Sequence, residues 1–252
     1  MGRAQAAPLL ERRALPADRA VALYGVVPAA LAGRRLVVDG HRAMVLRLGR
    51  LGLITAAVDP SEFSSHGIEQ RRTDRKWLRQ QARHHERVLE RMRADGNLWP
   101  APFLTIYEGL DAFDAAAQGN YTRWSRALSR LSGKVEYGVH AFIGPHALPS
   151  ADPYLLRVGR RARGRVTARI RSAATPLDAH ARDLWEAMRN AAAAMRRFDG
   201  RGVRGFVLGA TLLVDESGEL MLRAALSALA PAGHALGVSV YLEGPLPPFS
   251  FA

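Results

Sequence analysis

The stretch VALYGVVP, residues 21–28, decides the fold of the first half of the chain. It is short and apolar and it ends at a proline, which is typical of a buried strand rather than of a helix. Three further strands are predicted to follow it, at residues 36–38, 41–48 and 53–58. Asp39-Gly40, between the first two of these, is a hairpin signal, because glycine accepts a positive φ. The sequence therefore predicts an antiparallel meander.

A group of helices is predicted after the meander. Residues 59–61, with the sequence DPS, open it by supplying a turn and a helix cap. A long helix is expected at 73–94, because apolar residues recur there at spacings of three and four. These residues are Leu78, Ala82, His85, Leu89 and Met92. This stripe is expected to pack on the sheet.

The rest of the first half is predicted to contain one extended segment and two short helices. Residues 98–107 are expected to be extended, since Pro100 and Pro102 do not fit a helix interior. The helices are predicted at 110–117 and 121–131, split by Gly119-Asn120. We interpret residues 20–133 as an α+β domain made of a meander plus helices, preceded by a flexible arm rich in Ala, Arg and Pro at residues 1–19.

The second half has a simpler order of elements. The predicted elements are a strand at 135–143, a basic helix-like stretch at 154–171, a long helix at 178–198, a strand at 206–214, a turn at 215–218, a helix at 220–229 and a last strand at 235–242. This order resembles an incomplete or modified ferredoxin-like layer. The fold class expected for the chain is therefore α+β with two domains, the second of which, 134–252, is ferredoxin-like.

Composition restricts the function classes. The 252 residues include no cysteine, which excludes disulfides, zinc-thiolate sites and thiol nucleophiles and fits a cytoplasmic protein. No apolar run is long enough for a membrane-spanning helix, and the first 20 residues do not resemble a signal peptide. We therefore expect neither membrane insertion nor export.

The net charge of +13 suggests an anionic partner such as nucleic acid. Lys76 and Lys134 are the only lysines, so 34 of the 36 basic residues are arginine, a bias that GC-rich codon usage produces in any protein. The best nucleic-acid candidate is the arginine-rich segment 157–171, which has Tyr154 as its one nearby aromatic residue for base stacking. RNA or DNA binding through this segment is kept as the alternative function.

Catalytic and metal-binding patterns are weak. His84 and His85 point about 100° apart on a helix and have no histidine partner at i+4, so they do not form a zinc motif. We interpret His85, on the apolar stripe, as a core or interface histidine, with a hydrolase using His85 and a carboxylate as a lesser alternative. Gly200, Gly202 and Gly205 precede a strand, whereas phosphate-binding glycines follow one. We expect no enzyme activity, catalytic residue, cofactor or metal.

The most unusual stretch is the last one, GPLPPFSFA at residues 244–252. Its prolines favour an extended chain, and alternate residues of an extended chain point to the same side. The candidate structural or partner-binding residues are Pro245, Leu246, Pro247, Pro248, Phe249 and Phe251. Two interpretations stay open: the tail packs on its own domain, expected to be the second, or it contacts a partner.

Five segments in order resemble the GvpL/GvpF family of gas vesicle proteins. They are ALYGVV at 22–27, HHERVLERM at 84–92, LSGKVEYGVHAF at 131–142, LGATLLVDE at 208–216 and the terminal GPLPPFSFA. Members of the family typically end in GPWPPYSF, so Leu246 replaces a tryptophan and Phe249 a tyrosine. Residues 101–106, APFLTI, depart from the family's LPLRFGT, and Tyr137 and His140 stand where tryptophan and lysine are commoner.

The resemblance implies a non-enzymatic, cytoplasmic accessory protein of gas vesicle assembly. Such a protein is expected to bind the small hydrophobic shell protein, to keep it from aggregating, and to meet other gas vesicle accessory proteins. Tyr137 and His85 lie in matching segments and join the tail as candidate structural or partner-binding residues. An apolar shell protein needs shielding before it polymerises, because exposed apolar patches and strand edges associate.

Overall fold

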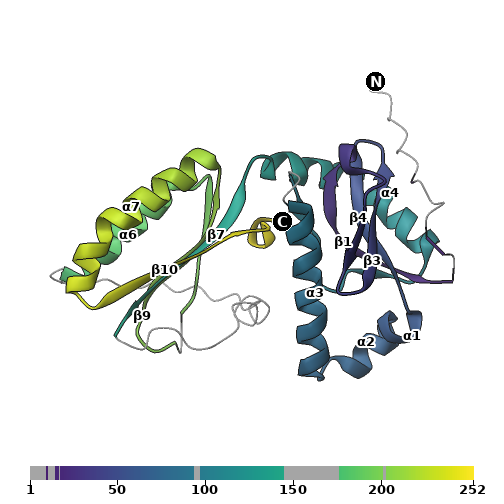
Figure 1. Cartoon of the computed structure of the whole chain (residues 1–252), viewed down its shortest axis with the longest axis horizontal. Helices are drawn as coiled ribbons and strands as arrows, with labels where there is room; N and C mark the ends of the chain where they lie inside the picture. The colour runs from purple at the N-terminus through teal and green to yellow at the C-terminus, as the bar shows by residue number, and fades with distance from the viewer. Residues whose placement is uncertain (1–9, 11–14, 17, 94–96, 145–175, 201–202) are drawn as a thin grey trace. The chain divides into compact units, whose positions relative to one another are not determined.

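A computed structural model describes residues 10, 15–16, 18–93, 97–144, 176–200 and 203–252 (Figure 1). Contacts divide the chain into two units. The first comprises Met1–Lys134 together with Leu246–Ala252, and the second comprises Val135–Pro245. Each unit contains helices and an antiparallel sheet, which confirms the predicted α+β class. The predicted basic stretch at 154–171 and most of the predicted arm lie outside the described residues.

The first unit is built on a six-stranded sheet with the order β2-β3-β4-β1-β5, in which β6 also pairs with β1. The strands are β1 (Ala20–Pro28), β2 (Arg35–Val38), β3 (His41–Leu48), β4 (Leu51–Val58), β5 (Trp99–Pro100) and β6 (Ile106–Tyr107). The four longest strands are those of the predicted meander. Asp39 and Gly40 turn β2 into β3 with φ values of 53° and 78°, as the hairpin signal requires.

Helices cover both faces of this sheet (Figure 1). Short helices α1 (Pro60–Phe63) and α2 (Ser65–Arg71) lead into α3 (Arg75–Arg93). The carboxylate of Asp74 caps α3 by accepting hydrogen bonds from the backbone of Lys76 and Trp77, both at 3.0 Å. Val88, Leu89 and Met92 of α3 pack against β1, β2, β3 and β4. The predicted packing of the α3 stripe is therefore correct.

The two helices predicted at 110–117 and 121–131 are one helix, α4 (Leu110–Leu131). The predicted break at Gly119-Asn120 is wrong. A single glycine costs a helix only about 1 kcal/mol, whereas α4 buries Phe113, Ala117, Trp124, Leu128 and Leu131 on one continuous face. The Asn120 side chain donates a hydrogen bond to the carbonyl of Ala116 at 2.8 Å and so does not end the helix.

The second unit has the element order βαββαβ. Its elements are β7 (Val135–Ile143), α6 (Pro176–Ala191), β8 (Ala194–Arg197), β9 (Phe206–Val214), α7 (Glu216–Ala235) and β10 (Val238–Leu246). The strand order β10-β7-β9-β8 is that of a ferredoxin-like sheet. Side chains from α6 and α7 bury Tyr137, Val139 and Leu212 on one face of this sheet.

Two predicted helices in this unit have wrong bounds. The helix predicted at 178–198 ends at Ala191, and Ala194–Arg197 forms β8, the strand that the prediction lacked. In its register Met195 lies opposite Leu212 on β9. Pairing with the free edge of the sheet therefore outweighs the helical periodicity of residues 194–197. The helix predicted at 220–229 extends from Glu216, after the capping residue Asp215, to Ala235.

The tail does not lie where the sequence predicts. Residues 246–252 pack with the first unit rather than the second. Phe249 contacts the core beneath α3, and Arg130 of α4 donates a hydrogen bond to the carbonyl of Phe251 at 2.5 Å. Phe249–Phe251 forms a single 3-10 turn, so the extended conformation ends at Pro248. The prediction that the tail packs on the second domain is wrong. The tail follows β10 directly in sequence, but this proximity does not determine which hydrophobic core buries Phe249 and Phe251.

Candidate functional site

His85 lies in the core of the first unit. It is 5% exposed, and burial lowers its pKa to about 4, so it is neutral near pH 7. Its ring is bonded to the backbone of Ala101. The centroids of Tyr24, Phe103 and Phe249 lie 5.4, 6.0 and 6.2 Å from that of His85. The structure therefore places His85 among aromatic rings, with its side chain almost fully buried.

Replacement of His85 by phenylalanine is expected to reduce the loss of stability on acidification. In the unfolded chain a histidine has a pKa near 6.5, and in the fold the pKa of His85 is about 4. Acid therefore protonates the unfolded state first, and stability falls as the pH drops from 6.5 towards 4. Between pH 7 and pH 5 this one group accounts for about 2 kcal/mol. Urea unfolding at both pH values measures the difference.

The control for this experiment is His66→Gln. His66 is an exposed histidine of α2 whose Nε2 lies 2.8 Å from the amide of Gln70. This variant should keep the pH dependence of the wild type. Equal pH dependence in wild type and His85→Phe would contradict the buried neutral state of His85.

His84, next in the sequence to His85, belongs to a polar cluster at the β2–β3 hairpin. Its Nδ1 lies 3.2 Å from a carboxylate oxygen of Asp39, and the same oxygen pairs with Arg87 at 2.8 Å. The ring of His41 lies edge-on to His84, with centroids 5.1 Å apart. Burial lowers the pKa of His84 and outweighs the opposite effect of Asp39. The cluster ties α3 to the β2–β3 turn.

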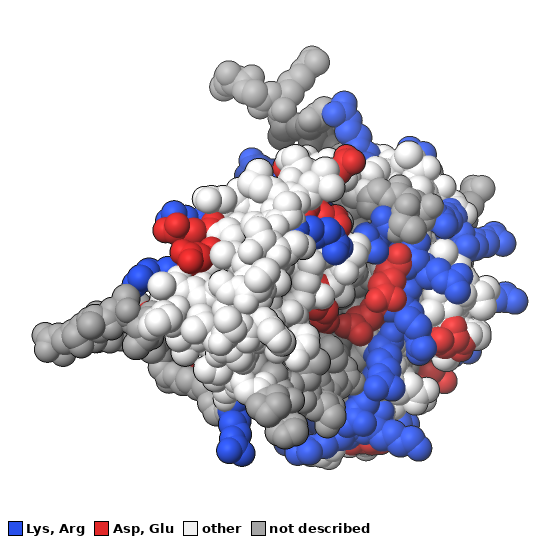
Figure 2. Space-filling view, turned by 60° about the vertical axis from the view of Figure 1, so that its left-hand side comes forward, with Lys and Arg blue, Asp and Glu red and all other residues white. Residues whose placement is uncertain are grey.

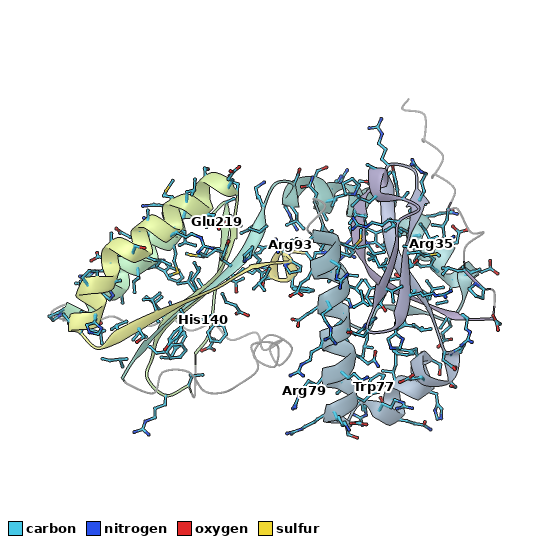
Figure 3. The ribbon with its side chains drawn as sticks, in the orientation of Figure 1. Arg35, Trp77, Arg79, Arg93, His140 and Glu219 are labelled. Carbon is cyan, nitrogen blue, oxygen red and sulfur yellow. The ribbon has the colours of Figure 1, made fainter. Side chains whose placement is uncertain are left out.

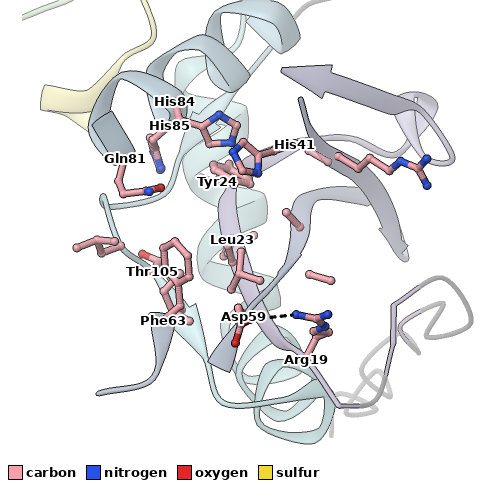
Figure 4. Close-up of a pocket in the computed structure, with 18 of the residues that line it drawn as sticks. Arg19, Leu23, Tyr24, His41, Asp59, Phe63, Gln81, His84, His85 and Thr105 are labelled. Carbon is pink, nitrogen blue, oxygen red and sulfur yellow. Dashed lines mark ion pairs between the residues drawn. The ribbon is translucent and has the colours of Figure 1, made fainter. Parts of the chain in front are cut away.

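A cavity of about 580 Å³ opens beside these histidines in the first unit (Figure 4). Its lining includes Ala22, Ala43 and Ala56 from three strands. Tyr24, Gln81, His84, His85, Phe103 and Thr105 also line it. At its far end Arg19 and Asp59 form an ion pair at 3.6 Å. The sequence did not predict this cavity, because its alanines come from three separate strands and meet only when the sheet has formed.

Tyr137 is fully buried in the second unit. Arg223 of α7 donates a hydrogen bond to its hydroxyl at 3.2 Å and also pairs with Glu219 at 2.9 Å. Gly244 lies against the ring, and a Cβ at this position would be 2.7 Å from Cδ1 of Tyr137. Because Gly244 also has a φ of +133°, no other residue fits there without strain. The structure gives Tyr137 a packing role.

The tail residues are mostly buried. Pro247, Pro248 and Phe251 are buried, and Leu246 and Phe249 are partly so, whereas Pro245 is exposed. The two rings therefore pack within the first unit, which corrects the interpretation that the tail packs on the second domain. A partner-binding role for the tail stays a prediction.

An apolar helix face is the most prominent exposed feature of the second unit. Leu220 and Met221 of α7 are 68% and 50% exposed. Exposed small or apolar residues continue along the helix at Ala224, Ala228, Pro231, Ala232 and Ala235. From Leu220 to Gly233 the single charged residue is Arg223. In Figure 2, which turns the half of the molecule with α7 forward, a broad surface area carries no charged side chain.

The α7 face was not predicted from the sequence, because the helix expected at 220–229 is shorter than α7. Pro231 stands inside the helix, which argues against continuation. The helix continues because Gly233 packs closely on His180 of α6, where a Cβ would be 2.7 Å from Nε2. The signal in the sequence was the run of alanines around Pro231 without any charge.

Aromatic rings also gather at one end of the other sheet face in the second unit. Phe142 and Phe206 pair across β7 and β9 with centroids 5.7 Å apart, and Phe198 lies 5.5 Å from Phe206. His140, seen in Figure 3, contacts Phe198 at 4.8 Å. These rings pack on one another, and Phe142 is buried, so this cluster offers no open platform for bases. The arginine-rich segment 157–171 lies outside the described residues.

The described part of the chain offers little for metal chemistry or membrane insertion. Within it, no group of three or more His, Asp or Glu side chains is placed to hold a metal ion. Among the described helices, none combines the length and apolar character needed to cross a bilayer. The hydrolase alternative loses its base, since His85 is buried.

Comparisons with known proteins agree with the fold and with the sequence segments. The family described as gas vesicle synthesis protein GvpL/GvpF matches residues 20–252. Gas vesicle protein L from Streptomyces sp. (strain CB03234) is 30% identical over 242 residues, covering 90% of this chain and 88% of that protein.

Two crystal structures of GvpF share the fold. The protein from Anabaena sp. PCC7120 aligns with a TM-score of 0.64 at 13% identity, over 93% of this chain and 98% of that one. The protein from Microcystis aeruginosa aligns with a TM-score of 0.60 at 15% identity, over 92% and 98%. Since the family match extends over nearly the whole chain, this protein belongs to the GvpL/GvpF family of gas vesicle synthesis proteins.

Proposed function

We propose that this protein is an assembly factor of gas vesicles that binds the small hydrophobic shell protein through the outward face of α7. Membership of the GvpL/GvpF family supports a role in gas vesicle formation. The proposal adds the binding partner and the surface. It also places the protein in the cytoplasm, without catalytic activity, in contact with other gas vesicle accessory proteins.

The exposed apolar face of α7 is the observation that carries the proposal. Leu220, Ala224 and Ala228 follow one another at spacings of four, so they form one stripe along the helix. The alanine side chains are small, so a partner helix or strand can approach the backbone of α7 closely. In a protein with a net charge of +13, so long an exposed stretch with one charge favours an uncharged, apolar partner.

Co-expression with the small shell protein tests the partner and the surface together. A tagged wild-type chain should retain the shell protein on purification. The double variant Ala224→Glu with Ala228→Glu should retain at least tenfold less, because binding would bury two carboxylates without partners. Both positions are exposed, so the unfolding midpoint should be unchanged.

The matched control is Ala115→Glu, which makes the same change at an exposed position of α4. This variant should retain the shell protein as the wild type does. Equal retention by the α7 double variant would remove α7 from the proposal. If the wild-type chain retains no shell protein while the Streptomyces relative does, the proposed partner is wrong.

A further inference from the structure

The cavity of the first unit exists because small residues meet on one face of the sheet. Ala22 of β1 lies opposite Ala56 of β4, and Ala43 of β3 belongs to the same core face. Further along this face the larger Tyr24, Val45 and Ile54 are covered by α3. Over the alanines, the helix instead presents Gln81 and His84. The space left between them has a volume of about 580 Å³.

One buried polar atom at the cavity has no partner among the described residues, Nε2 of His85. The Tyr24 side chain, which is 6% exposed, lines the cavity beside it. The ring is already bonded to the backbone of Ala101 through its other nitrogen, so in the neutral form Nε2 accepts. Buried polar groups without partners are rare in folded proteins and call for a specific explanation.

The two groups lie close enough to serve one ligand. The ring centroids of Tyr24 and His85 are 5.4 Å apart. Gln81 lies one helical turn before His85 and lines the same cavity (Figure 4). A hydroxyl or amide group both accepts and donates, and it therefore satisfies the Tyr24 hydroxyl and His85 Nε2 together.

The lining carries no excess charge. Arg19 and Arg42 are balanced by Asp59 and Glu62, and Asp59 is already paired with Arg19. Glu62 accepts a hydrogen bond from Nε1 of Trp77 at 2.5 Å. Burial lowers the pKa of His85 to about 4 and raises that of Tyr24 to about 12, so both stay neutral at pH 7. A charged ligand would lose its hydration without gaining an opposite charge.

We propose that this cavity is a binding site for an uncharged ligand with an apolar body and a hydroxyl or amide group. The ligand's body rests on Ala22, Ala43 and Ala56, and its polar group bonds to Tyr24 and His85. The cavity has the size of ordinary small-ligand sites, about 300–1,000 Å³. This site is separate from the α7 face and does not depend on the proposed function.

Two probes of the same shape test the polar contact. They are 4-methylphenol and 1,4-dimethylbenzene, which differ by a hydroxyl in place of a methyl group. In NMR titrations of the full chain, 4-methylphenol should bind at least tenfold more tightly, and the resonances that shift should be those of the cavity lining. Tyr24→Phe should reduce this preference to threefold or less, whereas Tyr241→Phe, in the second unit, should leave it unchanged.

Filling the cavity tests the location. Ala56→Leu should abolish binding of both probes. If that variant does not fold, the smaller change Ala43→Val replaces it and should weaken binding of both probes. Ala115→Leu, at an exposed helix position, is the matched control and should bind as the wild type does. Binding unaffected by Tyr24→Phe and by both cavity variants would overturn the proposal, as would equal affinity for the two probes or no binding at millimolar concentration.

A third probe, N-acetyltyrosinamide, distinguishes two sources of the same chemistry. If it binds like 4-methylphenol, the cavity accepts a tyrosine side chain of a partner. If 4-methylphenol alone binds, the ligand is a free small molecule. Either result supports the site, and failure of both phenols to bind overturns it.

Discussion

Deletion of residues 246–252 is expected to lower the thermal unfolding midpoint of the first unit by roughly 10 °C or more. Phe251 is 6% exposed, Phe249 contacts the core beneath α3, and Arg130 bonds to the carbonyl of Phe251. Burial of the two rings contributes about 3–6 kcal/mol before ordering costs. Loss of the tail also uncovers His85, which stands 6.2 Å from Phe249. Tryptophan fluorescence follows mainly this unit, since it contains Trp77, Trp99 and Trp124, three of the four tryptophans.

Deletion of Ala252 alone is the control for the tail. Ala252 is exposed, so this shorter deletion should leave the midpoint unchanged. Phe251→Ala should reproduce most of the effect of the full deletion, because it removes the most buried ring. A truncated protein that melts like the full chain and no longer supports gas vesicles would reverse the structural interpretation and make the tail a partner-binding segment.

Replacement of Gly25 by valine should destabilise the first unit by about 3 kcal/mol, near the upper end of the usual cost of overpacking. Gly25 lies in the middle of β1, directly after a bulge in its pairing with β4, and pairs with Pro100 of β5 on the other side. A Cβ there would be 2.7 Å from the carbonyl oxygen of Trp99 and 3.1 Å from Cδ2 of Leu89. The added side chain therefore pushes β5 away from β1. Urea unfolding measures the change.

Gly119→Ala provides a control of opposite sign. Gly119 stands within α4, and a Cβ there meets no atom within 4 Å. Alanine should therefore stabilise the helix by about 0.5–1 kcal/mol, because it loses less backbone entropy on folding. If Gly25→Val proves as stable as the wild type, the close approach of β5 to β1 is not present in solution.

The sequence predicted best where local chemistry and packing agree. The meander of β1 to β4 was identified from apolar runs and from Asp39-Gly40, since both the strands and their turn have local signals. The stripe of α3 likewise predicted which side packs on the sheet. The family followed from five ordered segments, and the comparisons confirmed it.

Prediction failed where the outcome depended on a neighbour distant in sequence. Gly119-Asn120 resembles a helix break, yet the common buried face of Phe113 and Trp124 holds α4 together. Residues 194–197 continue a helical pattern, but they complete the sheet because β9 offers an unpaired edge. In both cases tertiary contacts outweigh local propensities of about 1 kcal/mol per residue.

The sequence by itself determined the α+β class, the strands of the first meander and the family, because periodicity, turn residues and short motifs are local properties. Tertiary structure alone decided that the tail crosses back to the first unit, that three alanines leave a cavity beside His85, and that α7 presents an apolar face. Each of these depends on which surfaces meet once the chain has folded. The free energy of such contacts comes from burial between segments far apart in sequence, and no local pattern records their pairing.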